Sequence, residues 1–444
     1  MQKIVFNRSI FSRLPIKSFY GMADAAISPV LMLIATPIFL TYLGVEGYAI
    51  WVLINSIIAS LSLFNFGAND VLIKYISLGL IDENKKVLST IFFIQTFVVL
   101  FIYFCFLVGV YFFSESITKN SVQIVSILYI ALPIFFIKQF EQSLYAFYKG
   151  HEMFGHVALF STVSKFLFFS AQVLLAITTR SIYDVFLAGL VISIILLVVQ
   201  MIYMKKTHKD AVFFQSASIK KAKSMIFFGG WNWLSSIASI LNSHSDKWIV
   251  VALLGLETFG FYSLGILILN QLHNIAASSV AWIFPEISNR KNNGQLLSER
   301  YWRLMLAVIV GSYIVSLLLM QSSFLFEWWL NTETYASAKL YIDIFLIIFP
   351  VFTLSIVSYF YLLGLGLVKE KFYSDVLVLA SKVLILYFVI MNFEIDKWPL
   401  VFLIFISIQF ISYSRIICKN IPIKIEYLYS LLLLQLSVAF FRAF

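Results

Sequence analysis

Charged and titratable side chains occur inside long apolar segments of this 444-residue sequence. A charge at the centre of a membrane helix costs at least about 2.5–3.5 kcal/mol on insertion scales, so such a residue usually has a partner or a function. Acidic residues there could bind a coupling ion, and lysines could bind an anionic group. The residues concerned are Asp24, Lys138, Glu141, Lys165, His244, Asp246, Lys247 and Lys382.

A stripe of polar residues runs along one of these segments. Its members recur every three or four residues, and they are Asn232, Ser235, Ser239, Asn242 and Asp246. Because an α-helix turns once per 3.6 residues, this spacing places them on one face. Lipid cannot satisfy polar groups, so we expect the stripe to face a water-filled cavity or another helix. A shorter stripe on the next segment consists of Gln271, Asn274 and Ser278.

Several of these charges have a structural interpretation beside the functional one. Lys138 and Glu141 are three residues apart and could neutralise each other on one helix. Asp246 and Lys247 are adjacent, so they point to different sides of the helix and are poorly placed to pair with each other. Three further aspartates near the ends of apolar segments are predicted to be interfacial, namely Asp70, Asp343 and Asp375.

Two lysines occupy matching positions in the fifth and eleventh apolar segments. Lys165 and Lys382 have no acidic residue within helical reach. We hypothesise that they face a shared cavity and supply positive charge for an anionic headgroup. The alternative is that each snorkels to an interface or pairs with an acid on another helix.

Membrane-spanning helices are the elements that must position these residues. Hydrophobic residues make up 61% of the chain and charged residues 12%, whereas soluble proteins carry roughly 25% charged residues. Twelve apolar segments are long enough to cross a bilayer, at residues 18–43, 47–78, 87–113, 122–147, 154–178, 182–204, 226–254, 258–285, 302–330, 338–366, 371–393 and 398–416. A thirteenth, from Tyr427 to Phe441, is short and is compatible with a re-entrant helix, an interfacial helix or a tilted span.

The basic residues define the predicted orientation. With the N-terminus in the cytoplasm, most Lys and Arg residues of the loops lie inside, and the outer loops carry only Lys119, Arg180, Lys339 and Lys397. The net charge of +10 is therefore a topology signal, and nothing supports nucleic acid as a partner. The N-terminal basic stretch precedes a long apolar run without a cleavage site, which we interpret as the first span and not as a signal peptide.

The two halves of the sequence repeat. LGVEGYAIW (Leu43–Trp51) resembles LGLETFGFY (Leu254–Tyr262), and two shorter matches follow in the same order, LP with FP at Leu132 and Phe349 and VSK with ASK at Val163 and Ala380. Parallel repeats of this kind are a transporter architecture, with the substrate path between the bundles. The predicted organisation is a six-helix bundle at 1–204, a basic cytoplasmic linker at 205–225, a second six-helix bundle at 226–418 and a tail at 419–444.

Two segments resemble a known family. The segment YLGVEGYAIWVLINSIIASLSLFNFGANDVLIKYIS (Tyr42–Ser77) resembles the first two helices of the polysaccharide-biosynthesis flippases, which include the O-antigen flippases. The segment SDKWIVVALLGLETFGFYSLG (Ser245–Gly265) resembles their seventh-to-eighth helix motif. The resemblance implies the fold of the multidrug/oligosaccharidyl-lipid/polysaccharide exporters, with two parallel six-helix repeats around a central cavity. It also implies an undecaprenyl diphosphate-linked repeat unit as substrate and alternating access coupled to H⁺ or Na⁺.

The predicted function is therefore a flippase of the bacterial inner membrane that moves this oligosaccharide from the cytoplasmic to the outer leaflet. Its expected partners are the polyprenyl diphosphate-linked oligosaccharide, membrane lipids and other membrane proteins of polysaccharide assembly. The predicted cavity residues are Lys165, Lys382, Asp246, Lys247, Asn242, Ser239, Asn232, Asp24, Lys138 and Glu141. We expect no metal or organic cofactor, because the two cysteines and five histidines lack ligand spacing.

Two other classes of protein are alternatives to the flippase. A drug or metabolite exporter of the same fold, coupled to sodium or protons, is compatible with Asp24 and Asp246, whereas Lys165 and Lys382 argue against it. A membrane enzyme is disfavoured, because a polymerase usually has a large outer loop and the outer loops here are short. An acyltransferase needs a buried histidine with a partner, and His244 near Asn242 on one helix is a poor catalytic arrangement.

Overall fold

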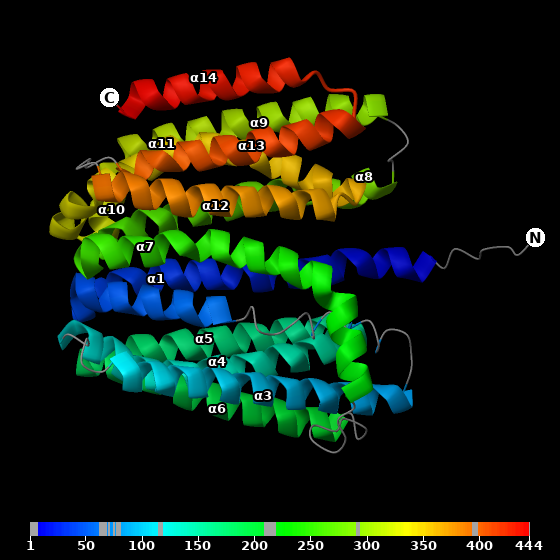
Figure 1. Ribbon diagram of the computed structural model, residues 1–444, viewed down its shortest axis with the longest axis vertical. Helices are drawn as coiled ribbons and strands as arrows, with labels where there is room; N and C mark the ends of the chain where they lie inside the picture. Colours follow the sequence, from blue (N-terminus) through cyan, green and yellow to red (C-terminus); the bar gives the residue numbers. More distant parts are fainter. Residues whose placement is uncertain are drawn as a thin grey trace, which may run out of the picture. The chain divides into compact units, whose positions relative to one another are not determined.

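The computed structural model describes residues 8–61, 69, 72–73, 76, 81–113, 119–207, 219–289, 294–392 and 398–443. Throughout these residues the regular structure is helical and no β-strand occurs, which confirms the predicted all-α class (Figure 1). The chain divides into two compact units, Met1–Trp233 (unit 1) and Leu234–Phe444 (unit 2). Each unit is described by itself below.

Unit 1 consists of long, mostly apolar helices. They are α1 (Arg8–Leu61), α3 (Ile81–Phe113), α4 (Lys119–Gly150), α5 (Phe154–Thr179) and α6 (Ile182–Thr207). Helix α1 packs on α4 and α5, α5 packs on α6, and α4 packs on α3 and α6.

Unit 2 is built around one central helix. Its elements are most of α7 (Ile219–Val280), α8 (Ile283–Asn289), α9 (Gly294–Gln321), α10 (Ser323–Leu330), α11 (Thr332–Leu365), α12 (Val368–Asn392), the short 3₁₀ helix Trp398–Val401, α13 (Phe402–Asn420) and α14 (Ile425–Ala443). Helix α11 contacts α8, α9, α10, α13 and α14, and most of its apolar part is buried. A helix that is apolar on all sides is expected to occupy such a central place.

Two glycines in matching positions confirm the internal repeat. Gly44 has φ 73° and ψ 177°, and Gly255 has φ 83° and ψ 177°. A residue with a Cβ essentially never adopts this backbone conformation, so glycine is required at both positions. Each glycine divides one continuous helical element, α1 or α7, into two helices that meet at a kink. The LGVE and LGLE motifs therefore perform the same structural task in the two halves.

The packing within the two units follows the same plan. Helix α4 packs on α3 and α6, and α11 packs on the corresponding α9 and α13. The contact of α5 with α6 likewise has its counterpart in the contact of α12 with α13. Pro133 in α4 and Pro350 in α11 occupy equivalent helix interiors, as the sequence repeat predicts.

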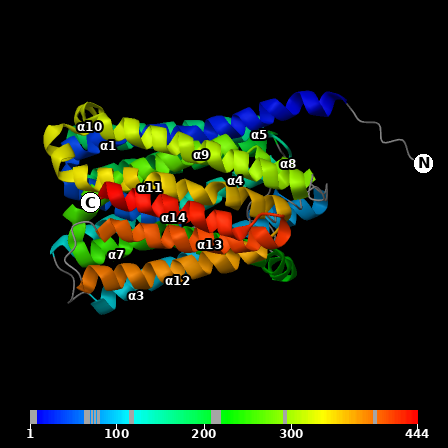
Figure 2. The ribbon, with the colours of Figure 1, turned by 90° about the horizontal axis from the view of Figure 1, so that it is seen from above.

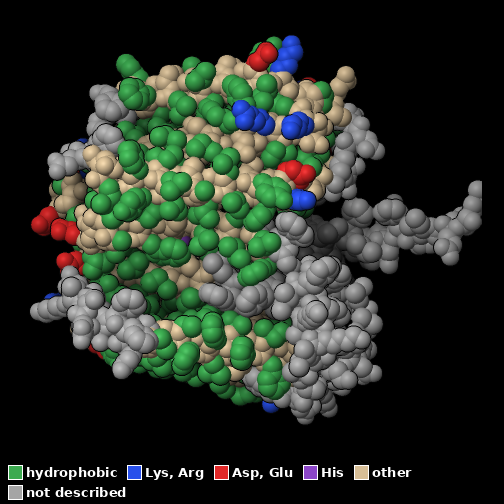
Figure 3. Space-filling model, in the orientation of Figure 1, with side chains coloured by type: hydrophobic (Ala, Val, Ile, Leu, Met, Phe, Trp, Pro, Cys, Tyr) green, Lys and Arg blue, Asp and Glu red, His purple; other side chains and the backbone are tan. Residues whose placement is uncertain are grey.

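The helices have the dimensions and surfaces of membrane spans. Eleven helices in the described part of the chain are long and apolar enough to cross a bilayer, and α1 and α7 each count once although a glycine divides them. Helix α6 buries polar residues such as Ser193 and Gln200, whereas its exposed face carries Val191, Ile195 and Ile202. Figure 3 shows hydrophobic side chains over most of the visible face of unit 2, with Lys and Arg gathered toward one end. Apolar outer faces of this kind require lipid as solvent, so the chain is a multi-pass membrane protein.

The structure partly defines the thirteenth apolar segment and the predicted linker. Helix α14 covers the thirteenth apolar segment and lies against α11 and α13 (Figures 1 and 2). Its 19 residues extend about 28 Å, close to the roughly 30 Å hydrocarbon thickness, so it is long enough to span. Within the predicted linker, residues 205–207 belong to α6, residues 219–225 belong to α7, and residues 208–218 lie outside the described residues.

Candidate functional site

A buried ion pair joins two helices of unit 2. Lys382 on α12 donates from Nζ to Oδ1 of Asp246 on α7 at 2.5 Å and to the backbone oxygen of Asn242 at 2.6 Å. Tyr262 donates its hydroxyl to the other carboxylate oxygen of Asp246, also at 2.5 Å. Asp246 is 2% exposed and Lys382 is 7% exposed. Lys382 therefore pairs with an acid on another helix, which is one of the interpretations that its sequence position allows.

A second buried ion pair lies beside the first. Lys371 donates to Asp375 at 2.6 Å within α12, and Tyr413 on α13 donates to the same carboxylate at 2.7 Å. The amide of Asn242 donates to the backbone oxygen of Asp375 at 2.9 Å, which links the two pairs. Asp375 was predicted to be interfacial; its side chain is buried between α12 and α13, and its depth in the membrane stays a prediction. The Lys–Asp spacing of four residues inside an apolar segment was the signal that could have identified this pair.

These ion pairs lie at the wall of a cavity inside unit 2, which we call the unit 2 cavity. Its volume is about 620 Å³, within the range of small-molecule sites, and α7, α11, α12 and α13 form its walls. Five of the predicted cavity residues line it, namely Ser239, Asn242, Asp246, Lys247 and Lys382. The polar stripe of α7 therefore faces a cavity over its described part, as its spacing predicts.

The second half of α7 contributes a polar face to the same cavity. Asn270, His273, Asn274 and Ala277 line it, at the three- and four-residue spacing of one helix face. The predicted stripe of Gln271, Asn274 and Ser278 shares only Asn274 with this face. The helix is therefore rotated by about one residue relative to the prediction.

Lys247 differs from the other two lysines of the cavity. Its Nζ lies 3.4 Å from Nδ1 of His244, and no carboxylate among the described residues forms an ion pair with it. As predicted, Asp246 and Lys247 do not pair with each other, although both line the cavity. Three lysines and two aspartates leave the lining with a net charge of +1 when both histidines are neutral.

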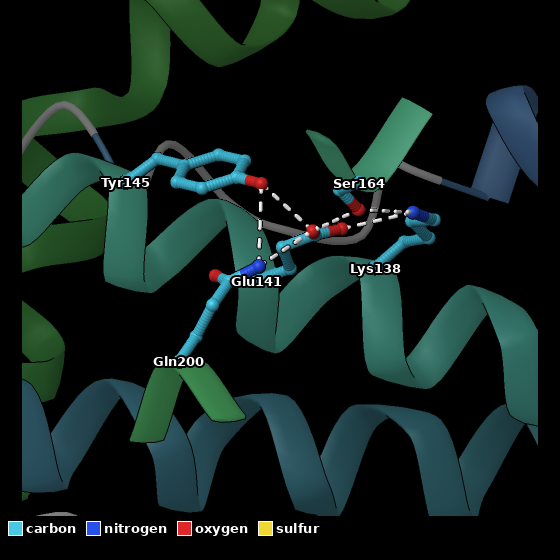
Figure 4. Close-up of polar contacts among 5 residues, drawn as sticks. All are labelled: Lys138, Glu141, Tyr145, Ser164 and Gln200. Carbon is cyan, nitrogen blue, oxygen red and sulfur yellow. Dashed lines mark hydrogen bonds and ion pairs between the residues drawn. The ribbon is translucent and has the colours of Figure 1, made fainter. Parts of the chain in front are cut away.

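Unit 1 holds its own buried carboxylate network (Figure 4). Lys138 donates to Glu141 at 2.9 Å, and so does Gln200 of α6, also at 2.9 Å. Tyr145 of α4 and Ser164 of α5 donate to Oε1 of Glu141, the oxygen that also accepts from Gln200, at 2.7 Å and 2.5 Å. Glu141 is 4% exposed, and the four donors tie α4 to α5 and α6. The predicted Lys138–Glu141 pair is confirmed, as part of a larger network that sequence spacing did not indicate.

The remaining predicted cavity residues have different outcomes. Lys165 is half-buried on α5, next to the Ser164 that binds Glu141. Lys165 belongs to unit 1 and Lys382 to unit 2, and a cavity shared by the two stays a prediction. The side chains of Asp24, Asn232 and Ser235 lie outside the described part of the structure, as does Asp70. No cluster of His, Cys, Asp or Glu among the described residues could hold a metal ion.

The sequence matches the model of a known protein family. A family model described as "Polysaccharide biosynthesis protein" matches residues 18–291. The chain belongs to this family. Both segments that resemble the polysaccharide-biosynthesis flippases, Tyr42–Ser77 and Ser245–Gly265, lie within the matched region. The family resemblance drawn from the sequence is therefore confirmed.

Relatives of this family member include a protein of Shigella flexneri named "Putative O-antigen transporter". The two chains are 24% identical over 382 residues, which cover 81% of this chain and 85% of the relative. Among solved structures, the lipid II flippase MurJ in an inward closed conformation has a TM-score of 0.68 at 15% identity, covering 96% of this chain and 97% of its own. An inward-facing multidrug resistance MATE family transporter of the MOP superfamily has a TM-score of 0.66 at 11% identity, covering 92% and 99%. The fold of the family member is therefore that of these transporters.

Proposed function

We propose that this protein is a flippase for undecaprenyl diphosphate-linked oligosaccharide repeat units of O-antigen or a related surface polysaccharide. It would carry the unit from the cytoplasmic to the outer leaflet of the bacterial inner membrane, with its own N-terminus in the cytoplasm. Membership of the polysaccharide biosynthesis family and the fold shared with MurJ support this proposal. The name of the Shigella flexneri relative points to the same class of substrate.

The observation that carries the proposal is the unit 2 cavity. Its lining combines three lysines with amide, hydroxyl and aromatic side chains inside a membrane-spanning unit. Amides and hydroxyls can satisfy sugar hydroxyls, and cations can bind the anionic groups of a lipid-linked sugar once water is removed. A cavity with net positive charge favours this substrate over the cationic drugs that a drug exporter would carry.

Alternating access would move the headgroup while the polyprenyl tail stays in the bilayer. We propose that an ion gradient, of protons or sodium, drives the cycle. In the same proposal, Lys165 supplies a cation for the diphosphate, and Asp24 and Glu141 are candidates for interaction with the ion. Lys382 has a partner in Asp246, so a direct role for it in substrate binding requires that the ion pair opens during transport.

A vesicle assay tests the proposal. The purified protein is reconstituted with labelled undecaprenyl diphosphate oligosaccharide, and a membrane-impermeant glycosidase reports how much label reaches the outer leaflet. We expect protein-dependent exposure of the label, its loss in Lys165→Ala and its retention in Lys165→Arg. Protein-free vesicles and Lys339→Ala, an exposed lysine of α11, are the controls. No exposure under any imposed proton or sodium gradient, with folded protein, would favour the drug-exporter alternative.

A further inference from the structure

Two asparagines of the unit 2 cavity are the starting point for a more specific assignment. Asn270 and Asn274 line the cavity on one face of α7, and both side chains are exposed. Neither forms a hydrogen bond with another described residue. An uncommitted amide within a membrane span is costly unless a polar ligand or water meets it. These amides are therefore available to a ligand that carries hydroxyl groups.

Two further polar atoms at the same wall lack a partner within the described protein. They are Oδ1 of Asn242 and Nδ1 of His273, and both are buried. Buried polar atoms are nearly always satisfied, so an orphaned pair beside a cavity calls for a specific explanation. Both residues line the cavity. Together with the two asparagines, they make this wall a cluster of unmet hydrogen-bonding groups.

Aromatic side chains form another part of the cavity wall. The ring of His273 stacks on Phe352 with centroids 4.3 Å apart, and Tyr359 and Phe360 line the cavity nearby on α11. Flat apolar surfaces beside a few fixed polar groups are typical of sites that bind ring-shaped polar ligands. A pyranose has an apolar face and a rim of hydroxyls, which fits this combination.

The number of lysines without an ion-pair partner in the cavity predicts how many acidic groups a bound sugar carries. Lys382 and Lys371 are each neutralised by an aspartate at 2.5 Å and 2.6 Å. Lys247 has its Nζ 3.4 Å from Nδ1 of His244 and has no ion-pair partner among the described residues. One uncommitted cation favours one acidic group on the ligand, because a charged hydrogen bond is about twice as strong as a neutral one.

We propose that the unit 2 cavity binds a saccharide that carries one acidic group, with Asn270 and Asn274 contacting its hydroxyls and Lys247 its carboxylate. This inference rests on the proposed function and deepens it, because it assigns the sugar part of the substrate to unit 2. It also predicts that the repeat unit includes a uronic acid or a similarly acidic sugar. The residues of the two buried ion pairs then have a positioning role, because they hold the cavity-lining helices α7 and α12 together.

The test is binding of soluble sugars to the full-length protein in detergent, measured by saturation-transfer NMR. The probes are cellobiouronic acid, which has one carboxylate, and cellobiose, its neutral counterpart. We expect saturable binding of the acidic disaccharide about 10- to 100-fold tighter than that of cellobiose. Lys247→Gln should abolish this preference, whereas Asn274→Ala should weaken both sugars. The matched controls, Lys339→Gln and Asn420→Ala, replace exposed residues outside the cavity and should bind both sugars like the wild type.

Three results would overturn the assignment. They are no saturable binding of either sugar, equal binding of the two by the wild type, and an unchanged preference in a folded Lys247→Gln variant. Binding of tetraphenylphosphonium that depends on Asn274 would also contradict it, because it would mark the cavity as a site for hydrophobic cations. The vesicle assay separates this outcome from failure of the proposed function. If the protein exposes lipid-linked sugar but fails the binding test, only the assignment of an acidic sugar to the unit 2 cavity is refuted. If it binds the acidic sugar but does not flip the lipid-linked substrate, only the proposed flippase function is refuted.

Discussion

The pair between Lys382 and Asp246 offers a quantitative test of what holds unit 2 together. Replacing Lys382 by Met removes both hydrogen bonds that Nζ donates. It leaves a carboxylate that is 2% exposed and has only the Tyr262 hydroxyl as a hydrogen-bond partner among the described residues. Breaking a buried ion pair in this way costs about 3–5 kcal/mol. Asp246→Asn should cost a similar amount, because it leaves a buried ammonium without an opposite charge, with only neutral oxygens, those of Asn242 and of the new amide, as acceptors.

The double variant Lys382→Met/Asp246→Asn should be more stable than either single variant. It buries no unpaired charge, and its remaining loss is that of hydrogen bonds worth about 1 kcal/mol each. The single losses together should therefore exceed the loss in the double variant by about 4 kcal/mol or more, which is the expected coupling between the two positions. The free energies of unfolding are compared through thermal midpoints in detergent, followed by size-exclusion fluorescence. Lys339→Met, at an exposed position of α11, should change stability by less than about 0.5 kcal/mol.

Additivity would refute this reasoning. If the double variant is destabilised by the sum of the single losses, the contact between Nζ and the carboxylate contributes nothing specific. Transport by the same variants then separates two roles of Lys382. A stable double variant that still flips lipid-linked sugar shows that the pair is structural, and a stable one that fails to flip shows that at least one of its two charges is needed for transport.

Three further predictions concern other parts of the chain. Glu141→Gln should destabilise the protein by about 3 kcal/mol in the same thermal assay, because the amide nitrogen cannot accept from Lys138 and the three hydrogen bonds at the other oxygen lose their charge. An unchanged midpoint would contradict the network. Gly255→Ala should cost about 1–3 kcal/mol because of its backbone conformation, whereas Gly311→Ala, in a helix with open space around it, should be neutral or stabilising by up to about 1 kcal/mol; equal effects would refute the argument. In a variant without native cysteines, Thr207→Cys should react with an impermeant maleimide from the cytoplasmic side and Ser181→Cys from the outer side, and the reverse labelling would invert the predicted topology.

Much of the fold was accessible from the sequence because lipid imposes simple rules. A span needs about twenty apolar residues and must satisfy its backbone internally, so hydropathy alone predicted the helices and their approximate limits. The repeat was visible at Gly44 and Gly255, since a conformation open only to glycine restricts the residue type at both positions. Helix α14 was left undecided because a segment of its length can lie in or across a membrane, and its packing on α11 and α13 is a tertiary property.

The partners of the buried charges could not be predicted in the same way. Lys382 and Asp246 were both identified as candidate cavity residues, yet they are separated by 136 positions and sit on different helices. Asp375 is predicted to be interfacial because it lies near the start of an apolar segment. In the structure its carboxylate is buried and accepts a hydrogen bond from Tyr413 on a neighbouring helix. Only Lys138 and Glu141, three residues apart on one helix, were paired correctly.

The sequence by itself determined the helical class, the spans, the repeat and the residue types that must avoid lipid. These follow from local periodicity and from the solvent, both of which act on neighbouring residues. The tertiary structure alone decided which charge neutralises which, and how far each helix is rotated about its axis. The second half of α7 illustrates the difference, because Asn270, His273 and Asn274 face the cavity and the predicted Gln271 and Ser278 do not. Helix rotation is set by packing against other helices, and the pattern within one segment fixes it only to about one residue.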